Sequence, residues 1–467
     1  MGMQYIRHSV VIAALCLAGA CAQFPKEGKV NTPAEHALSS GQTFAVQEQW
    51  WLVLKDPQLN RYINAALKNA PSLKSAQARF EQLQAELGIL GEESKVQTGL
   101  VAEGKGALLG KRPSASFAEP DRNFRLAHIS AQAKWSFDFW GKNKARIASV
   151  LGRRNAAYYE IRQAEILLTH AVAEQYFTWQ GLLAQQDILN QRIENSKQIE
   201  KLMQERVKAQ LAAPSAVYEQ QQMQQQLALQ KLQLDKEIAH ARHALAVLTG
   251  SKPDSLDKQQ PAAMSGVPDV KVGGLKADIL GRRPDISVQR ELLDVRSQNI
   301  REAKADFYPN IELKLLTGLS HIDAFDLVRG NSGMLGVVPA VHLPIFTSGA
   351  LRSKLAKRNA EYDEQVAVYD QTVLDAMRLA ADAITDYQNH KAQHAQAEQA
   401  AATARKISAS ILRRVNAGLA NKAEYYRKQD DVLQQQAVVL MKHSAALAAW
   451  SNLNVQLGGG FKQEQHL

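Results

Sequence analysis

Aromatic residues and cysteines are scarce in this chain of 467 residues, and long apolar runs are missing beyond one short stretch near the start. Aromatics make up only 6% of the residues while Ala, Gln and Leu are abundant, which is typical of long helices rather than of a thick globular core. The formal net charge of +10 is not gathered into a run of like charges. It therefore indicates a solvated surface and no nucleic-acid partner.

Motifs for catalysis and metal binding are missing as well. No Gly-x-Ser-x-Gly elbow and no pairing of a nucleophile with a base can be identified. His390 and His394 have the spacing of zinc ligands on a helix, but no third ligand or motif glutamate lies near them in the sequence. We therefore expect no enzyme, no metal site and no cofactor other than a covalent lipid.

That lipid is expected at the start of the chain. Arg7 precedes an apolar run, 10–20, that ends on small residues before Cys21. This pattern is typical of a cleaved secretory signal, and the run is too short to span a membrane. Its last residues resemble a bacterial lipobox, which would make Cys21 the lipidated, palmitate-bearing first mature residue; a plain signal peptide with an incidental cysteine is the alternative. Ala22 in place of Asp favours, by the same resemblance, sorting to the outer membrane.

The rest of the chain repeats itself. The heptapeptide RVKAQLA that begins at Arg206 has a similar counterpart, RVNAGLA, 208 positions later at Arg414, and other matches recur at similar offsets. Similar offsets at separated places indicate an ancient duplication, with two internal repeats per chain. The predicted parts are a signal peptide (1–20), a lipid-anchored leader (21–44), a first repeat (45–250), a Pro/Gly-rich linker (251–275), a second repeat (276–461) and a tail (462–467).

Each repeat is predicted to contain one very long helix followed by a second helix. Neither Gly nor Pro occurs between Gly349 and Gly418, and at 1.5 Å per residue such a helix would be about 100 Å long. Its apolar positions from Tyr362 to Tyr387 alternate in steps of four and three, which predicts a coiled-coil seam. The other helices are expected at about 144–212, 215–249 and 420–457.

Ahead of each long helix the period of the pattern changes from 3.6 to 2. From 127 to 139 the odd positions are apolar and the even ones polar, which fits a membrane-spanning strand with one face in lipid and one in water. A half-buried strand of a water-soluble domain is the alternative. Aromatic residues at its lower end predict a membrane-interface girdle of Trp135, Phe137, Phe139 and Trp140. The four strands are expected at about 96–108, 127–139, 310–319 and 335–346.

Four spanning strands cannot form a closed barrel alone. An open strand edge in lipid leaves backbone groups unpaired at a cost of several kcal/mol each, and the smallest common barrels have about eight strands. Several copies of the chain must therefore share one barrel, and three copies would supply about twelve strands.

Five short motifs, in order along the chain, resemble a known family. They begin at Trp50, Asp138, Gly281, Leu343 and Ala417, with the sequences WWLVLKDPQL, DFWGK, GRRPDI (followed by ADFYPNI), LPIF and AGLA. Together they resemble outer-membrane efflux lipoproteins of the NodT group, relatives of TolC, over residues 45 to 461. One departure is that the first repeat lacks the Pro that usually precedes its first strand, whereas the second keeps Pro309.

The resemblance implies a mainly α protein with a membrane β-barrel. It would be a trimeric, TolC-like channel with a twelve-stranded shared barrel and a long periplasmic α-helical barrel, lipid-anchored in the cell outer membrane and extending into the periplasm. It would function as a passive exit duct in a tripartite drug-efflux system, and would thereby contribute to multidrug resistance. A periplasmic adaptor (a membrane fusion protein) would open it, and an inner-membrane pump of RND or MFS type would drive transport.

The resemblance also implies that the helical hairpin tips, near 206–220 and 414–430, form the periplasmic gate and the adaptor-docking site. The residues assigned to them are Arg206, Leu211, Pro214, Tyr218, Arg414, Gly418, Leu419, Tyr425, Tyr426, Arg427 and Asp430. The family usually has an Asp followed three residues later by an Arg here, and this chain has the reverse, Arg427 and Asp430. We expect these two to form an ion pair within the helix. We also expect contacts of Tyr425 and Tyr426, more than charge, to hold the gate.

Two other functions remain open at this level. An exit channel for type I protein secretion or for metal efflux would share the fold. A periplasmic coiled-coil scaffold lipoprotein would share the helices, but it would not need a strand with one lipid-facing side, so segment 127–139 distinguishes it from a channel.

Overall fold

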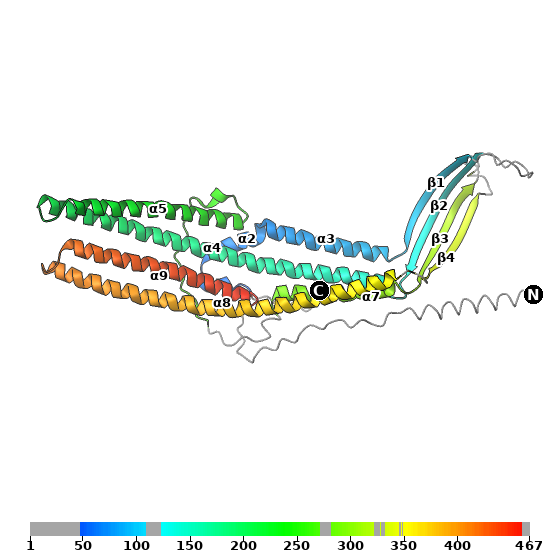
Figure 1. The fold of residues 1–467 in the computed structure, drawn as a ribbon. Coiled ribbons are helices and arrows are strands. Elements are labelled where there is room, and N and C mark those ends of the chain that lie inside the picture. Colours follow the sequence, from blue (N-terminus) through cyan, green and yellow to red (C-terminus); the bar gives the residue numbers. More distant parts are fainter. Residues whose placement is uncertain are drawn as a thin grey trace, which may run out of the picture. The chain divides into compact units, whose positions relative to one another are not determined.

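The computed structural model describes residues 47–108, 123–270, 282–321, 327, 332–344, 347 and 349–459 (Figure 1). The expected signal peptide, leader, lipidation site Cys21 and tail lie outside these residues. The chain divides into two compact units, the first formed largely by Phe80–Ala156 and Gln289–Tyr369 and the second largely by Ala34–Arg79, Ala157–Val288 and Asp370–Leu467. Within the described ranges, no helix is long and apolar enough to cross a membrane.

The first unit contains a four-stranded antiparallel sheet. Its strands are β1 (Gln97–Leu108), β2 (Asn123–Phe137), β3 (Asn310–His321) and β4 (Gly333–His342). They pair in the order β1-β2-β3-β4, so β1 and β4 are the two edges (Figure 1). All four expected segments contain a strand, although the ends differ.

The expected lower end of β2 was wrong by two residues. Asp138 lies outside the strand because its carboxylate caps the helix that follows, accepting hydrogen bonds from the backbone N–H of Asn143 at 3.1 Å and of Lys144 at 2.9 Å. The backbone then turns at Gly141, with φ of +70°. A girdle residue, Phe139, is therefore in a turn and not in the strand. β4 likewise ends at His342, two residues before a proline.

The helices of the first unit pack against one another at the end of the sheet where β2 leads into α4. They are parts of α3 (Pro71–Glu93), α4 (Lys142–Lys208), α7 (Pro284–Ala305) and α8 (Ala350–Asn416). Gly152 of α4 lies so near α7 that a Cβ atom would come within 2.7 Å of the Val295 side chain. Ser149 also donates to the side chain of Asn299 at 2.8 Å.

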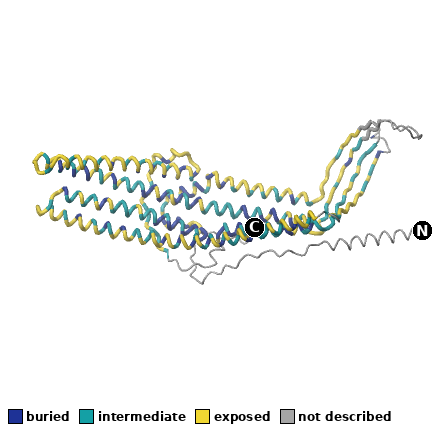
Figure 2. The backbone as a smooth tube through the Cα atoms, in the orientation of Figure 1, coloured by how far each residue is buried: buried dark blue, intermediate teal, exposed yellow. Residues whose placement is uncertain are grey.

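The second unit is built on two helical hairpins. In one, α4 is followed by α5 (Ser215–Leu248), and in the other α8 is followed by α9 (Lys422–Gln456). The expected seam on α8 is confirmed for its small residues and for one tyrosine, each at most 4% exposed. These are Val366, Val373, Ala376, Ala380, Ala383 and Tyr387. Figure 2 shows the buried positions along the helices and the exposed ones at their tips.

Short elements cover the hairpins of the second unit. Trp50 of the 3-10 helix η2 (Trp50–Leu54) packs edge-on against Trp450 of α9, with ring centroids 5.2 Å apart. Asp56 caps α2 (Pro57–Asn69) and accepts a hydrogen bond from the Tyr176 hydroxyl at 2.9 Å. Burial, together with this carboxylate, raises the pKa of Tyr176 far above its ordinary value.

The linker between the repeats is packed, not loose, where it is described. After the 3-10 helix η3 (Pro253–Leu256), the chain runs along α2 and α8. Gln259 accepts from the Tyr62 hydroxyl at 2.7 Å, and the backbone N–H of Val270 donates to the Tyr387 hydroxyl at 3.0 Å. The linker therefore contributes hydrogen bonds to the core of the second unit.

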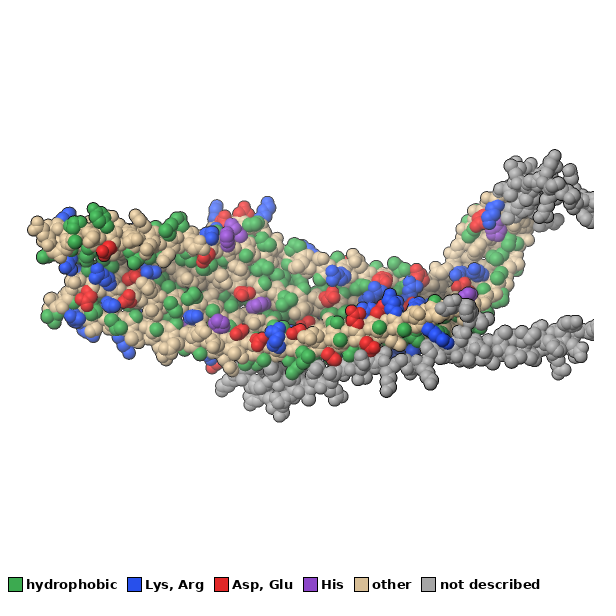
Figure 3. Space-filling model, viewed as in Figure 1, with side chains coloured by type: hydrophobic (Ala, Val, Ile, Leu, Met, Phe, Trp, Pro, Cys, Tyr) green, Lys and Arg blue, Asp and Glu red, His purple; other side chains and the backbone are tan. Residues whose placement is uncertain are grey.

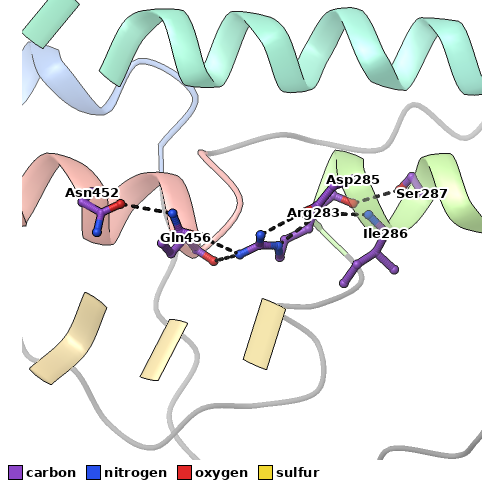
Figure 4. A network of polar contacts seen from close by, with 6 residues as sticks. All are labelled: Arg283, Asp285, Ile286, Ser287, Asn452 and Gln456. Carbon is purple, nitrogen blue, oxygen red and sulfur yellow. Dashed lines mark hydrogen bonds and ion pairs between the residues drawn. The ribbon is translucent and has the colours of Figure 1, made fainter. Parts of the chain in front are cut away.

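Arg283 joins the start of α7 to the end of α9 (Figure 4). It is only 5% exposed and forms a two-pronged ion pair with Asp285, at 3.1 and 2.8 Å. Its remaining nitrogen donates to the backbone carbonyl of Gln456 at 2.8 Å. The first helical turn begins at Pro284, where the missing backbone N–H of proline is tolerated.

Candidate functional site: a two-faced sheet and two hairpin tips

One face of the sheet is apolar and exposed. The pairing register places Ile129 of β2 beside Ala102 of β1 and Leu319 of β3, and Leu315 beside Val337 of β4. Residues paired in this way point to the same face. The exposed fractions are high for this chain taken alone: 76% for Leu100, 44% for Leu315, 84% for Leu335, 62% for Val337 and 67% for Val341. Such a contiguous apolar surface requires a covering partner or lipid.

The opposite face of the sheet carries the polar and charged side chains of β2 and β3, next to a few apolar ones such as Val338 of β4. His128 contacts Ser130 at 2.7 Å, Gln132 donates to Ser130 at 3.2 Å, and Lys134 forms an ion pair with Glu312 at 3.2 Å. Lys, Arg, Asp, Glu and His side chains are visible on the strands in Figure 3, next to hydrophobic ones. The strict alternation predicted for 127–139 is therefore realised as two chemically different faces through position 137.

Aromatic side chains gather at the end of the sheet where β2 meets α4. The rings of Trp135 and Phe137 are 4.1 Å apart, and those of Phe137 and Phe139 are stacked at 5.5 Å. Trp140 stacks on Tyr308 at 4.5 Å and donates to the Pro309 carbonyl at 2.9 Å. Three of the predicted girdle residues, Trp135, Phe137 and Phe139, thus form one stack, whereas Trp140 pairs with Tyr308, which the strand pattern did not include.

A charged contact lies at the same end of the sheet. The carboxylate of Asp306 is 2.7 Å from the Lys142 ammonium and 2.5 Å from that of Lys354. Burial alone would raise the pKa of Asp306, but hydrogen bonds from the two lysines outweigh it and the pKa is lowered. Asp306 therefore stays ionised and fixes the first turns of α4 and α8 side by side.

The two hairpin tips have the same backbone geometry. At the first tip the backbone N–H of Leu211 donates to the Arg206 carbonyl at 2.8 Å, and at the second Leu419 donates to Arg414 at 2.8 Å. Each turn has one left-handed residue, with φ of +59° at Gln210 and +76° at Gly418. Both turns present their leucine to solvent, at 70% exposed for Leu211 and 71% for Leu419.

Just behind the turns a small apolar cluster joins the hairpins. Ile199 and Met203 of α4 and Ala423 of α9 are buried together, with Tyr426 packed against them. Asn195 donates to the backbone carbonyl of Tyr426 at 2.7 Å, and the Tyr425 and Tyr426 rings are 5.4 Å apart. Of the other predicted tip residues, Pro214 directly precedes α5, and Tyr218 is 67% exposed.

The expected ion pair between Arg427 and Asp430 was wrong. Arg427 is exposed, whereas both carboxylate oxygens of Asp430 accept hydrogen bonds from Arg192 of α4, at 2.9 and 3.2 Å. Asp430 also accepts from Gln434 at 2.7 Å. Arg192 was missed because its partner is 238 positions away in the sequence, although the seam of α4 contains a signal for it that is discussed below.

Among the residues that the structure describes, no group of three or more His, Cys, Asp or Glu side chains could hold a metal ion. His394 lies beside His443 of α9, with ring centroids 4.8 Å apart, and the Nε2 atom of His443 lies 2.8 Å from the Ser265 carbonyl. These histidines therefore take part in packing between α8, α9 and the linker.

Comparison with known proteins shows that most of the chain matches one protein family. Residues 62–251 and 275–459 match the family of outer membrane efflux proteins. The multidrug resistance outer membrane protein MdtP of Shigella flexneri is 27% identical over 452 residues, covering 91% of this chain and 88% of that protein. The putative multidrug resistance outer membrane protein MdtQ of Escherichia coli K12 is 28% identical over 459 residues, with 95% and 94% covered.

A solved structure has the same fold. The outer membrane protein VceC of Vibrio cholerae superimposes with a TM-score of 0.80 at 26% sequence identity, covering 90% of this chain and 100% of VceC. The match therefore extends over both the sheet and the helical hairpins.

Proposed function

The chain belongs to the outer membrane efflux protein family, and from this membership we propose that it forms the outer-membrane exit duct of a tripartite drug-efflux system. The observation that carries the proposal is the sheet: one face is apolar and exposed, and the other carries the charged and polar side chains. Such a sheet fits a wall between lipid and water. A coiled-coil scaffold would not need it. The family and fold are those of channels and not of enzymes.

The edges of the sheet support a shared barrel. The unpaired edges, β1 and β4, would leave backbone groups without partners in lipid. Pairing β1 of one chain with β4 of the next removes every edge, and three chains give a closed barrel of about twelve strands. We therefore propose a homotrimer in which the hairpins of the three chains form a periplasmic tube.

The outer-membrane position is expected to be reinforced at two places. The aromatic cluster of Trp135, Phe137, Phe139 and Trp140 would lie at the periplasmic membrane interface. A lipid on Cys21 would anchor the start of the mature chain. Two repeats, 45–250 and 276–461, would account for the matched geometry of the tips at Leu211 and Leu419.

The tips would be the docking site for a periplasmic adaptor, which opens the duct for an inner-membrane pump of RND or MFS type. Each tip exposes a leucine on a hydrogen-bonded turn, which is the kind of small apolar anchor that a partner helix can cover. The names of the relatives favour drugs over secreted proteins or metal ions as cargo.

The proposal is tested with the full-length protein purified in detergent. We expect native mass spectrometry to give a trimer and planar bilayers to show single-channel conductance. A water-soluble monomer without conductance would contradict it. For the tips, the double variant Leu211→Asp with Leu419→Asp should lose co-purification with the adaptor after mild crosslinking while the trimer persists. Val247→Asp, an exposed apolar position of α5 away from the tips, is the matched control.

A further inference from the structure

The polar face of the sheet carries more positive than negative charge. Its described side chains include three lysines and two glutamates, which the pairing register places on the same side as Ser130 and Gln132. They are Lys105, Lys134, Lys314, Glu103 and Glu312.

The carboxylates neutralise only two of these lysines. Lys105 is 3.0 Å from Glu103, and Lys134 is 3.2 Å from Glu312. Lys314 is exposed and forms no ion pair within the described part of the chain. Glu312 forms its ion pair with Lys134 and also accepts hydrogen bonds from Asn310 at 3.2 Å and Ser136 at 3.5 Å, so its single negative charge is shared among several donors.

The register makes the excess charge costly. Lys134 of β2 lies directly opposite Lys314 of β3. Like charges directly opposite each other on one face of a sheet destabilise the pairing. A negatively charged species in the water beside this row would relieve the repulsion. The row, and not a single lysine, is therefore the feature that favours an anion.

Resting on the proposed function, we propose that the Lys134–Lys314 row lines the barrel lumen as a positively charged ring that selects anionic solutes. When three sheets close with their polar faces inward, each contributes one uncompensated lysine at the same level. A ring of cationic side chains in a narrow, low-dielectric pore raises the local concentration of anions and repels cations. The preferred cargo is thus a compound bearing a carboxylate or sulfonate group.

The test measures reversal potentials of the reconstituted trimer in a KCl gradient. The wild type should pass chloride several-fold better than potassium. Lys314→Gln should move the ratio of chloride to potassium permeability towards one, and Lys314→Glu should make potassium the more permeant ion. Lys314→Arg should keep the wild-type ratio, which separates charge from damage to the sheet. Lys252→Gln, an exposed lysine after α5, removes the same charge away from the barrel and should change nothing.

Two outcomes would overturn the inference while leaving the channel intact. One is a wild type that prefers potassium. The other is a ratio that is unchanged in Lys314→Gln but shifts in Arg427→Gln, since selection would then occur at the tips. Absence of conductance in every variant would instead contradict the proposed channel, and the inference with it.

Discussion

Arg192 and Asp430 form a two-pronged ion pair that joins α4 to α9 close to the hairpin tips. The guanidinium Nε and Nη2 atoms lie 2.9 and 3.2 Å from the two carboxylate oxygens. Their side chains are only 17% and 25% exposed, so the pair is shielded from salt more than a surface pair is. It connects the two hairpins of one chain, whereas Arg427 contributes nothing to that connection.

We expect Asp430→Asn to destabilise the hairpins, because it leaves the Arg192 guanidinium partly buried with a weaker partner. The loss should be about 1–3 kcal/mol, between the values for exposed and for buried pairs. A double-mutant cycle with Arg192→Gln, followed by thermal unfolding in detergent, would measure the coupling. Lys428→Gln removes the exposed pair with Asp431 on the same helix and should cost less than about 1 kcal/mol. Additive effects of the two Arg192–Asp430 substitutions would contradict the expectation.

The sequence contained a signal for this pair that the prediction did not use. Along α4 the positions Leu189, Arg192, Ser196, Ile199 and Met203 follow each other in steps of three and four, and all except Arg192 are buried. A charged residue inside such a seam needs an opposite charge from the facing helix. The pattern could have predicted that a partner exists, but only the fold identifies it.

At the tips, the free-energy cost of a left-handed backbone conformation can be measured. Gln210 has φ of +59°, a conformation that L-residues other than Gly adopt at a cost of about 1–2 kcal/mol. Gln210→Gly should therefore slow hydrogen exchange of the amides in the first tip, to which the Leu211 turn belongs. Gly418→Ala should accelerate exchange at the second tip; a Cβ there has no neighbour within 4 Å, so only the backbone conformation changes. Faster exchange in Gln210→Gly would refute the argument.

At Gly318 in the sheet only glycine fits. A Cβ on Gly318 of β3 would lie 2.0 Å from the backbone carbonyl oxygen of Ile129 in β2, which cannot move without breaking the ladder. Gly318→Ala should therefore abolish most of the assembled trimer on unheated gels. Gly99→Ala in β1, where a Cβ meets nothing within 4 Å, is the control and should assemble normally. Equal assembly of both variants would show that the strand contact is looser than described.

The main helices and strands were predictable because apolar residues recur in them at regular intervals. The alternation in 127–137 and the small-residue seam of α8 each depend on local pattern alone, and both were found where expected. The ends were less predictable, because they depend on side chains such as Asp138 that can either continue a strand or cap a helix. For contacts between distant helices, such as that of Arg192, the local pattern indicates that a partner is needed, but it does not identify the partner, which is 238 positions away.

Acid should weaken the contact of α8, α9 and the linker at His443. This side chain faces the His394 ring, the Ser265 carbonyl and the Glu398 carboxylate, and its neighbour Lys442 is engaged by Gln393 at 2.7 Å. Burial lowers the pKa of His443 below its ordinary value of about 6.5; Ser265 and Glu398 oppose this, and His394 adds to it.

Because the pKa of His443 is lower in the folded protein, the unfolded chain binds more protons between the two values, and stability falls as the pH drops from 6.5 through the folded pKa. We expect the melting temperature of the purified protein to fall between pH 7.5 and pH 5.5, and His443→Gln to reduce this fall. The exposed residue His240, substituted to Gln, should leave it unchanged. If His443→Gln and His240→Gln have the same pH dependence as the wild type, the protonation of His443 does not govern the acid sensitivity of this contact.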